Sequence, residues 1–216
     1  MERHRIGIAM ARMPRLTAEF AFVSAGLLIA LMGWVVDLSA ALGAEAGEGH
    51  GGGLFLRLNI TFFALGLAGI GVGYEQHDRF FREPTWGLRY LAGYLLLADG
   101  LLHAFAFTDH LAEPFPATVF GVVAPLQVTV GLALPYLRRS LDPAWLGLAA
   151  FLVAAYAATR AATVWPLAQV EEVEALGILS KIVEVVAILA LVRLIRAARR
   201  ERPASSTPRT PAPGDP

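Results

Sequence analysis

The chain contains no cysteine, and only 17% of its residues are charged. The missing thiols exclude disulfides, thiolate metal sites, cysteine-held iron–sulfur clusters and covalent c-type haem. A soluble domain usually has about 25% charged residues, so the low charge content argues against one. The formal net charge is zero, which predicts no general attraction to nucleic acid. Sequence signatures of serine hydrolases, zinc proteases and P-loop enzymes are also missing, so the sequence does not favour an enzyme.

Apolar residues, by contrast, are abundant and make up 56% of the chain. A helix needs roughly 20 mainly apolar residues to cross the hydrocarbon core of a membrane. Six segments meet this requirement: 18–42, 54–74, 86–107, 116–137, 143–165 and 176–197. The sequence therefore predicts an all-α membrane protein built as a bundle of six transmembrane helices, with the lipid bilayer as its first partner.

The connections between these segments differ in charge. Four of them are basic: the N-terminal segment, the second loop with Arg79, Arg82 and Arg89, the fourth loop with Arg138 and Arg139, and the C-terminal end. The other three loops contain acidic residues and neither lysine nor arginine. Short loops rich in basic residues stay in the cytoplasm. The pattern predicts a protein of the cell inner (plasma) membrane with both termini cytoplasmic (N-in, C-in).

This topology divides the chain into three parts. Residues 1–17 form a basic cytoplasmic segment, and residues 18–197 form the transmembrane domain. Residues 198–216 are rich in proline, serine and threonine, which predicts a disordered cytoplasmic tail.

The third predicted span contains two ionisable residues, Asp99 and His103. Their spacing of four places them on one face of a helix, which His110 continues. A charge facing lipid costs at least ~2.5–3.5 kcal/mol, so this face should point into the bundle. Polar residues of other spans are expected to share the space: Asn59, Gln127, Arg160, Lys181 and Glu184.

These residues concentrate in the half of the bundle that the charge pattern places outside. The sequence therefore predicts an outward-facing polar pocket that binds or translocates a small polar solute or protons. Within it, Asp99 is expected to pair with Arg160, and Lys181 with Glu184, three residues further along one helix.

Other functions stay open. A divalent metal normally needs at least three protein ligands; the candidates are Asp99, His103, His110 and His50, with Glu184 as a further ligand. A b-type haem bound by His103, or a quinone, would make the chain a redox subunit. A non-catalytic accessory or scaffold subunit of a membrane complex, or a homo-oligomer, is the remaining alternative.

The Asp99-x-x-x-His103 element in a six-span chain resembles the metal-bearing subunit of the membrane methane and ammonia monooxygenases. The resemblance covers five residues, so no function of that family is carried over. A second similarity is internal. Ala25-Gly26, Leu28 and Gly33 of the first span match Ala92-Gly93, Leu95 and Gly100 of the third, which hints at a duplicated helical hairpin.

Overall fold

The computed structural model describes residues 17–43, 53–167 and 169–201. These residues form six α-helices and one short 3-10 turn, Arg139–Leu141; the helices are α1 (Ala18–Gly43), α2 (Leu54–Arg82), α3 (Pro84–Asp109), α4 (Pro114–Ala133), α5 (Asp142–Ala161) and α6 (Ala175–Glu201). Each helix is long and apolar enough to cross a membrane. This confirms the predicted all-α architecture of a multi-pass membrane protein. Which side of the membrane the termini occupy stays a prediction.

Four helix ends lie at least four residues from their predicted positions: α5 ends at Ala161 and α6 at Glu201, and the ends of α2 and α4 have identifiable causes. Helix α2 continues past Tyr74 to Arg82, because residues 75–82 include neither glycine nor proline to end it. It stops before Pro84, which restricts the residue ahead of it and instead begins α3. Helix α4 ends at Ala133, short of the predicted 137, because Pro135 has no backbone N–H to continue the helix.

The domain boundaries are only partly visible. Helix α6 runs to Glu201, so the first residues of the predicted tail are helical. The rest of that tail, the N-terminal residues 1–16 and the 44–52 loop with His50 lie outside the described residues.

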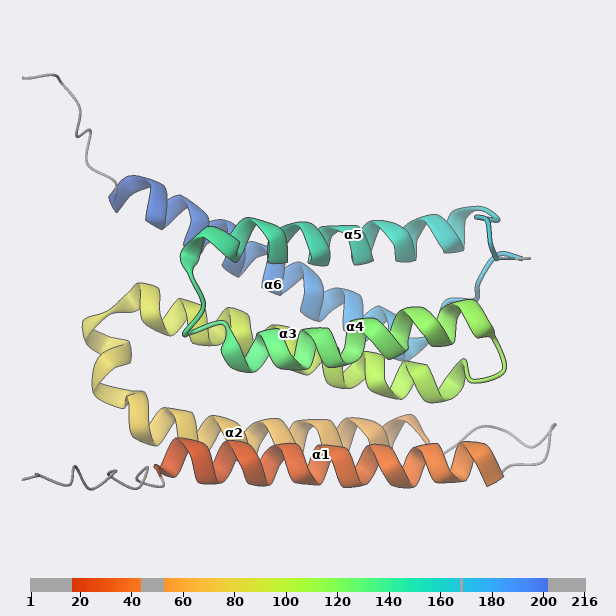
Figure 1. Cartoon of the computed structure of the whole chain (residues 1–216), viewed down its shortest axis with the longest axis horizontal. Helices are drawn as coiled ribbons and strands as arrows, with labels where there is room; N and C mark the ends of the chain where they lie inside the picture. Colours follow the sequence, from red (N-terminus) through yellow and green to blue (C-terminus); the bar gives the residue numbers. More distant parts are fainter. Residues whose placement is uncertain (1–16, 44–52, 168, 202–216) are drawn as a thin grey trace, which may run out of the picture.

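Helix α3 is the central element of the bundle. It packs against α1, α2, α4 and α6, while α1 and α2 form a hairpin on one side and α5 and α6 lie on the other (Figure 1). Within the most apolar stretch, 67% of the residues of α3 are buried, against 17% for α1 and for α5. A helix so thoroughly covered is the one on which polar groups can be kept away from lipid.

The two ends of the bundle differ in charge, and we name them accordingly. The basic end holds the α2–α3 and α4–α5 connections, the start of α1 and the end of α6 (Figure 1). The acidic end holds the α3–α4 connection, residues 110–113, and the α5–α6 connection, residues 162–174. Chain direction thus places all the described basic connections together, as the sequence predicted.

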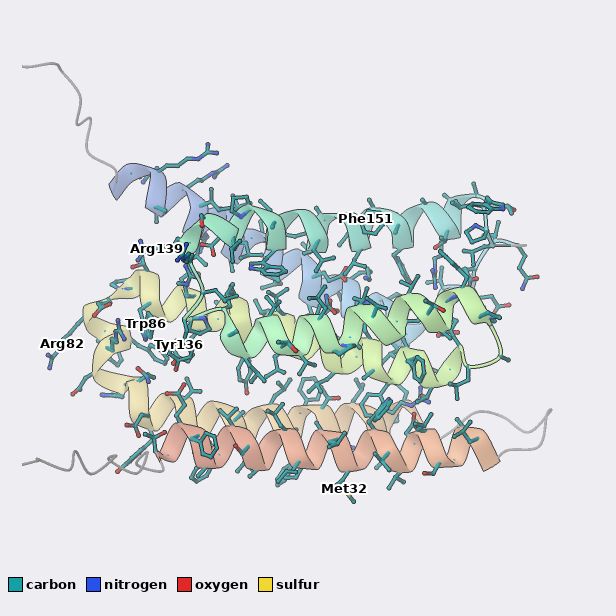
Figure 2. The ribbon with its side chains drawn as sticks, in the orientation of Figure 1. Met32, Arg82, Trp86, Tyr136, Arg139 and Phe151 are labelled. Atoms are coloured by element: carbon teal, nitrogen blue, oxygen red, sulfur yellow. The ribbon has the colours of Figure 1, made fainter. Side chains whose placement is uncertain are left out.

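The outer helices present apolar side chains away from the bundle. Met32 of α1 is 61% exposed and projects outward in Figure 2. Phe62 and Phe63 of α2 and Phe151 of α5 are similarly exposed. Apolar surface of this extent is rare on soluble monomers and is what a helix facing lipid presents.

Buried arginines fasten α3 at both ends. Near the acidic end, Arg57 of α2 lies 3.0 Å from Asp37 of α1 and 2.7 Å from Asp109 of α3. Near the basic end, the guanidinium of Arg89 donates to the carbonyl of Leu134 at 2.7 Å and faces Asp142 at 3.3 Å. The placement of Arg89 in the second loop is wrong, because Pro84 already begins the helix and Arg89 is 3% exposed.

Glycines allow the first two hairpins to close tightly. A Cβ on Gly26 would clash with the carbonyl of Ala64, and a Cβ on Gly93 would lie 2.5 Å from that of Gly131. The same number of residues separates Gly26 from Gly93 and Ala64 from Gly131. The α1–α2 and α3–α4 hairpins therefore use equivalent positions for the same close approach, which supports the duplication suggested by the sequence.

Substitution of these glycines tests the packing. We expect Gly93→Ala to destabilise the protein by about 1–3 kcal/mol, because its methyl group overpacks the α3–α4 crossing. Gly66→Ala is the matched control, since nothing lies within 4 Å of its Cβ; it should be neutral or gain up to about 1 kcal/mol in helix propensity. Unfolding in mixed micelles measures both, and equal stability of the two variants would contradict this assignment.

Candidate functional site

A hydrogen-bonded polar cluster lies in the middle of the bundle, centred on Asp99 of α3. The carboxylate accepts one hydrogen bond from the amide of Gln127 on α4, at 2.6 Å, and another from the hydroxyl of Ser180 on α6, also at 2.6 Å. Asp99 and Gln127 are fully buried, and Ser180 is 4% exposed. Donors from two neighbouring helices therefore satisfy the buried carboxylate of α3, as its removal from water requires.

Gln127 also fixes which ring nitrogen of His103 carries a hydrogen. Because its NH2 group donates to Asp99, its carbonyl oxygen faces Nδ1 of His103 at 2.6 Å. A carbonyl oxygen only accepts, so Nδ1 carries a hydrogen. The imidazole ring is further held by Phe120, stacked at a centroid distance of 5.5 Å. The remaining nitrogen, Nε2, is therefore held in a defined position.

Glu184 of α6 faces this nitrogen. Its Oε1 lies 3.8 Å from Nε2 of His103, and its Oε2 lies 2.5 Å from the ammonium of Lys181. Neither oxygen has a well-oriented hydrogen bond within the described part of the chain, although Glu184 is fully buried. Lys181 thus balances the charge of Glu184 by proximity, while Oε1 and Nε2 face each other without a hydrogen bond; the hydroxyl of Ser180 lies 3.5 Å from Nε2.

The cluster is one positive charge short of neutrality. Asp99 and Glu184 carry two negative charges, and Lys181 carries one positive charge when His103 is neutral. A net charge in an apolar interior is costly. One proton at the His103–Glu184 pair removes it, and these two groups are the ones with free capacity to hold it.

A cavity of about 200 Å³ adjoins the cluster between α4 and α5. His103, Ser180 and Lys181 form the polar part of its wall beside the cluster. Further polar side chains line it towards the acidic end: His110, Thr159, Arg160, Glu171 and Glu174. The rest is mainly apolar, with Val119 and Phe120 from α4; α5 contributes Phe151, Leu152, Ala155 and Tyr156. The cavity extends to the acidic end, where Glu171 and Glu174 line it. The cluster is therefore accessible from one end of the bundle through an apolar passage.

A second group of potential ligands lies at this mouth. His110, Glu113 and Glu171 each place a ligand atom within 4.8 Å of the others. His110 and Glu171 line the cavity, and Glu113 lies beside them in the α3–α4 connection. Of the candidate ligands expected from the sequence, Asp99 and His103 lie together with Glu184, the expected further ligand, whereas His110 belongs to this second group.

The structure brings five of the seven predicted site residues together: Asp99, His103, Gln127, Lys181 and Glu184. The predicted Lys181–Glu184 pair forms. The predicted Asp99–Arg160 pair does not, because Arg160 lies in the last turn of α5 and donates to the carbonyl of Glu172.

Asn59 is the other predicted residue outside the cluster, since it is exposed on α2. Ser180 belongs to the cluster although the sequence does not predict it there. Serine is common in membrane helices, so its type gives no signal. Its position gives a signal, because Ser180 precedes Glu184 by four residues and therefore shares a helix face with it.

The bridging amide gives a direct test of the cluster. Gln127→Leu leaves Asp99 Oδ2 and His103 Nδ1 without their buried partner, and we expect a loss of about 3 kcal/mol or more. Asn59→Leu, a matched amide on an exposed surface, should change stability by less than about 0.5 kcal/mol. Unfolding in mixed micelles compares them; a Gln127→Leu variant as stable as the parent would show that the cluster is not hydrogen-bonded as described.

Comparison with known protein families, with curated proteins and with solved structures finds no match to this chain. The resemblance to the monooxygenase subunit thus stays limited to the five residues from Asp99 to His103. The function is consequently argued from the geometry of the cluster and of the cavity beside it.

Proposed function

We propose that this multi-pass membrane protein binds a small amphiphilic molecule in the cavity between α4 and α5 and takes up one proton at the His103–Glu184 pair beside it. The observation that carries the proposal is the juxtaposition of an apolar passage with a buried cluster lacking one positive charge. The proposal replaces the small polar solute expected from the sequence with an amphiphilic molecule, and it retains the expected involvement of protons.

The walls of the cavity favour the amphiphilic ligand. Between the polar groups at the mouth and those at the cluster, a strongly polar solute would lose its hydration against Phe120, Phe151 and Leu152. A molecule with an apolar body buries that body against these side chains and brings its head to His103, Ser180 and Lys181. A quinone-like molecule has this form. The apolar wall with polar groups beside the cluster is therefore the observation that favours the quinone alternative over the haem alternative.

Haem suits the site less well than a quinone. An axial histidine needs one free ring nitrogen directed at the iron. In His103 the nitrogen left for iron would be Nε2, and the carboxylate of Glu184 lies in front of it at 3.8 Å. The amide of Gln127 and the carboxylate of Glu184 instead place the ring between a hydrogen-bond acceptor and a proton acceptor, the arrangement of a proton relay.

The same cluster suits a proton better than a divalent metal. Asp99 is already hydrogen-bonded to Gln127 and Ser180, and the ammonium of Lys181 lies against Glu184. A divalent ion would carry the cluster past neutrality and would stand beside that ammonium. A proton adds one charge and needs no rearrangement of the Asp99 hydrogen bonds.

Filling the cavity tests the ligand. Ala155 lines the cavity, whereas its neighbour Ala154 is exposed outside it. A short-chain benzoquinone, our probe, should raise the unfolding temperature of the purified protein in nanodiscs, because binding to the folded state stabilises it by about 2.7 kcal/mol at 100 times its Kd. Ala155→Phe should abolish this shift, and Ala154→Phe should retain it. A shift produced by glycerol but not by the quinone would instead support a polar solute.

Infrared titration of the purified protein tests the proton. In the parent, one carboxyl or imidazole signal of the cluster should titrate in difference spectra taken against pH. Glu184→Gln and Asp99→Asn should both remove that titration, because each substitution takes away one negative charge and leaves the cluster neutral without a proton. Glu174→Gln, at the cavity mouth, should leave the signal unchanged. A titration that persists in both cluster variants would refute proton uptake there.

A further inference from the structure

His110, at the mouth of the cavity, is held in the orientation of a metal ligand. Its Nδ1 lies 2.8 Å from the carbonyl oxygen of Ala106, one turn earlier in α3. Because a carbonyl only accepts, Nδ1 carries the ring hydrogen and Nε2 presents a lone pair in the neutral ring. The ring also lies against Phe120 at a centroid distance of 5.1 Å. An N–H donated to a backbone carbonyl is the usual way in which proteins orient a metal-binding histidine.

Two carboxylates share this space. Glu113 and Glu171 have no side-chain hydrogen bond or ion pair with any described residue. Their main chains are nevertheless anchored: the N–H of Glu113 donates to the carbonyl of His110 at 2.9 Å, and the N–H of Glu171 donates to that of Thr159 at 3.0 Å. The three side chains come from two connections that are far apart in the sequence.

From this arrangement we infer that His110, Glu113 and Glu171 form a binding site for a divalent transition metal, with Zn²⁺ as the best-suited ion. One imidazole and two carboxylates are ligands that Zn²⁺ accepts. The two carboxylates carry the charge that a divalent ion neutralises, unlike the Asp99 cluster with its lysine. Ligand atoms sharing a tetrahedral zinc at about 2.1 Å lie roughly 3.4 Å apart. The three ligand atoms lie within 4.8 Å of one another, so binding would draw the two carboxylates inward onto the ion.

Such an ion would join the α3–α4 connection to the α5–α6 connection across the cavity mouth. Its fourth position is left for water or for an oxygen of the cavity occupant, as in zinc sites that have three protein ligands. The site requires neither the proton nor the amphiphile proposed above, so its presence can be tested separately.

Metal titration of the purified full-length protein tests the site. Calorimetry with ZnCl2 should show one bound ion per chain, and Co²⁺ should give the absorption of a tetrahedral complex with one nitrogen ligand. His110→Ala and Glu171→Gln should each weaken binding by about tenfold or more, since even residues that merely orient metal ligands contribute 10–100-fold. Zinc should also raise the unfolding temperature of the parent and have a smaller effect in both variants.

Matched controls separate this site from the other candidates. His103→Gln and Glu174→Gln should bind zinc like the parent, as should His50→Ala and the distant His77→Ala. The inference is overturned if the parent binds no zinc, or if His103→Gln abolishes binding while His110→Ala preserves it. Normal zinc binding without any quinone shift would reject the proposed function alone, and the reverse result would reject the metal site alone.

Discussion

A carboxylate in an apolar bundle must obtain its hydrogen bonds from neighbouring helices, because neither lipid nor water supplies them. Asp99 obtains its own from α4 through Gln127 and from α6 through Ser180. This requirement fixes which faces of the three helices meet. It also explains why α3 is central, since an outer helix could not surround a charge with partners on several sides.

Buried charges hold α3 at three depths. Arg57 with its two aspartates lies towards the acidic end, Asp99 with its amide and hydroxyl in the middle, and Arg89 towards the basic end. In the Arg57 group both carboxylates accept hydrogen bonds from the guanidinium, and in the Arg89 group the guanidinium faces Asp142 and a helix carbonyl, so both groups act as structural links between helices. The middle cluster differs in its fully buried Glu184, neither oxygen of which has a well-oriented hydrogen bond to a described residue, and in the cavity of about 200 Å³ beside it. That difference, and not burial alone, is what separates a functional candidate from a structural pair.

Much of this arrangement follows from the sequence, but partner choice does not. Apolar runs locate the helices, and the spacing of four puts Asp99 and His103 on one face. The pair Lys181–Glu184 is local and equally predictable. Arg160 was matched to Asp99 by charge alone, yet its depth in the last turn of α5 directs it to a loop carbonyl. Which helix covers α3, and hence the roles of Gln127 and Ser180, depends on packing between segments distant in the chain.

The equivalent glycines of the two hairpins have an evolutionary consequence. Counting along the chain as from Gly26 to Gly93, the counterparts of Asp99 and His103 are Met32 and Val36. Both counterparts are outward-facing, 61% and 60% exposed, whereas the later hairpin is packed against α6 through α3. If one ancestral hairpin gave rise to both, the α1–α2 copy, which faces lipid, was constrained to stay apolar. Only the α3–α4 copy was free to acquire ionisable side chains, so the burial of α3 by α6 would have preceded the polar cluster.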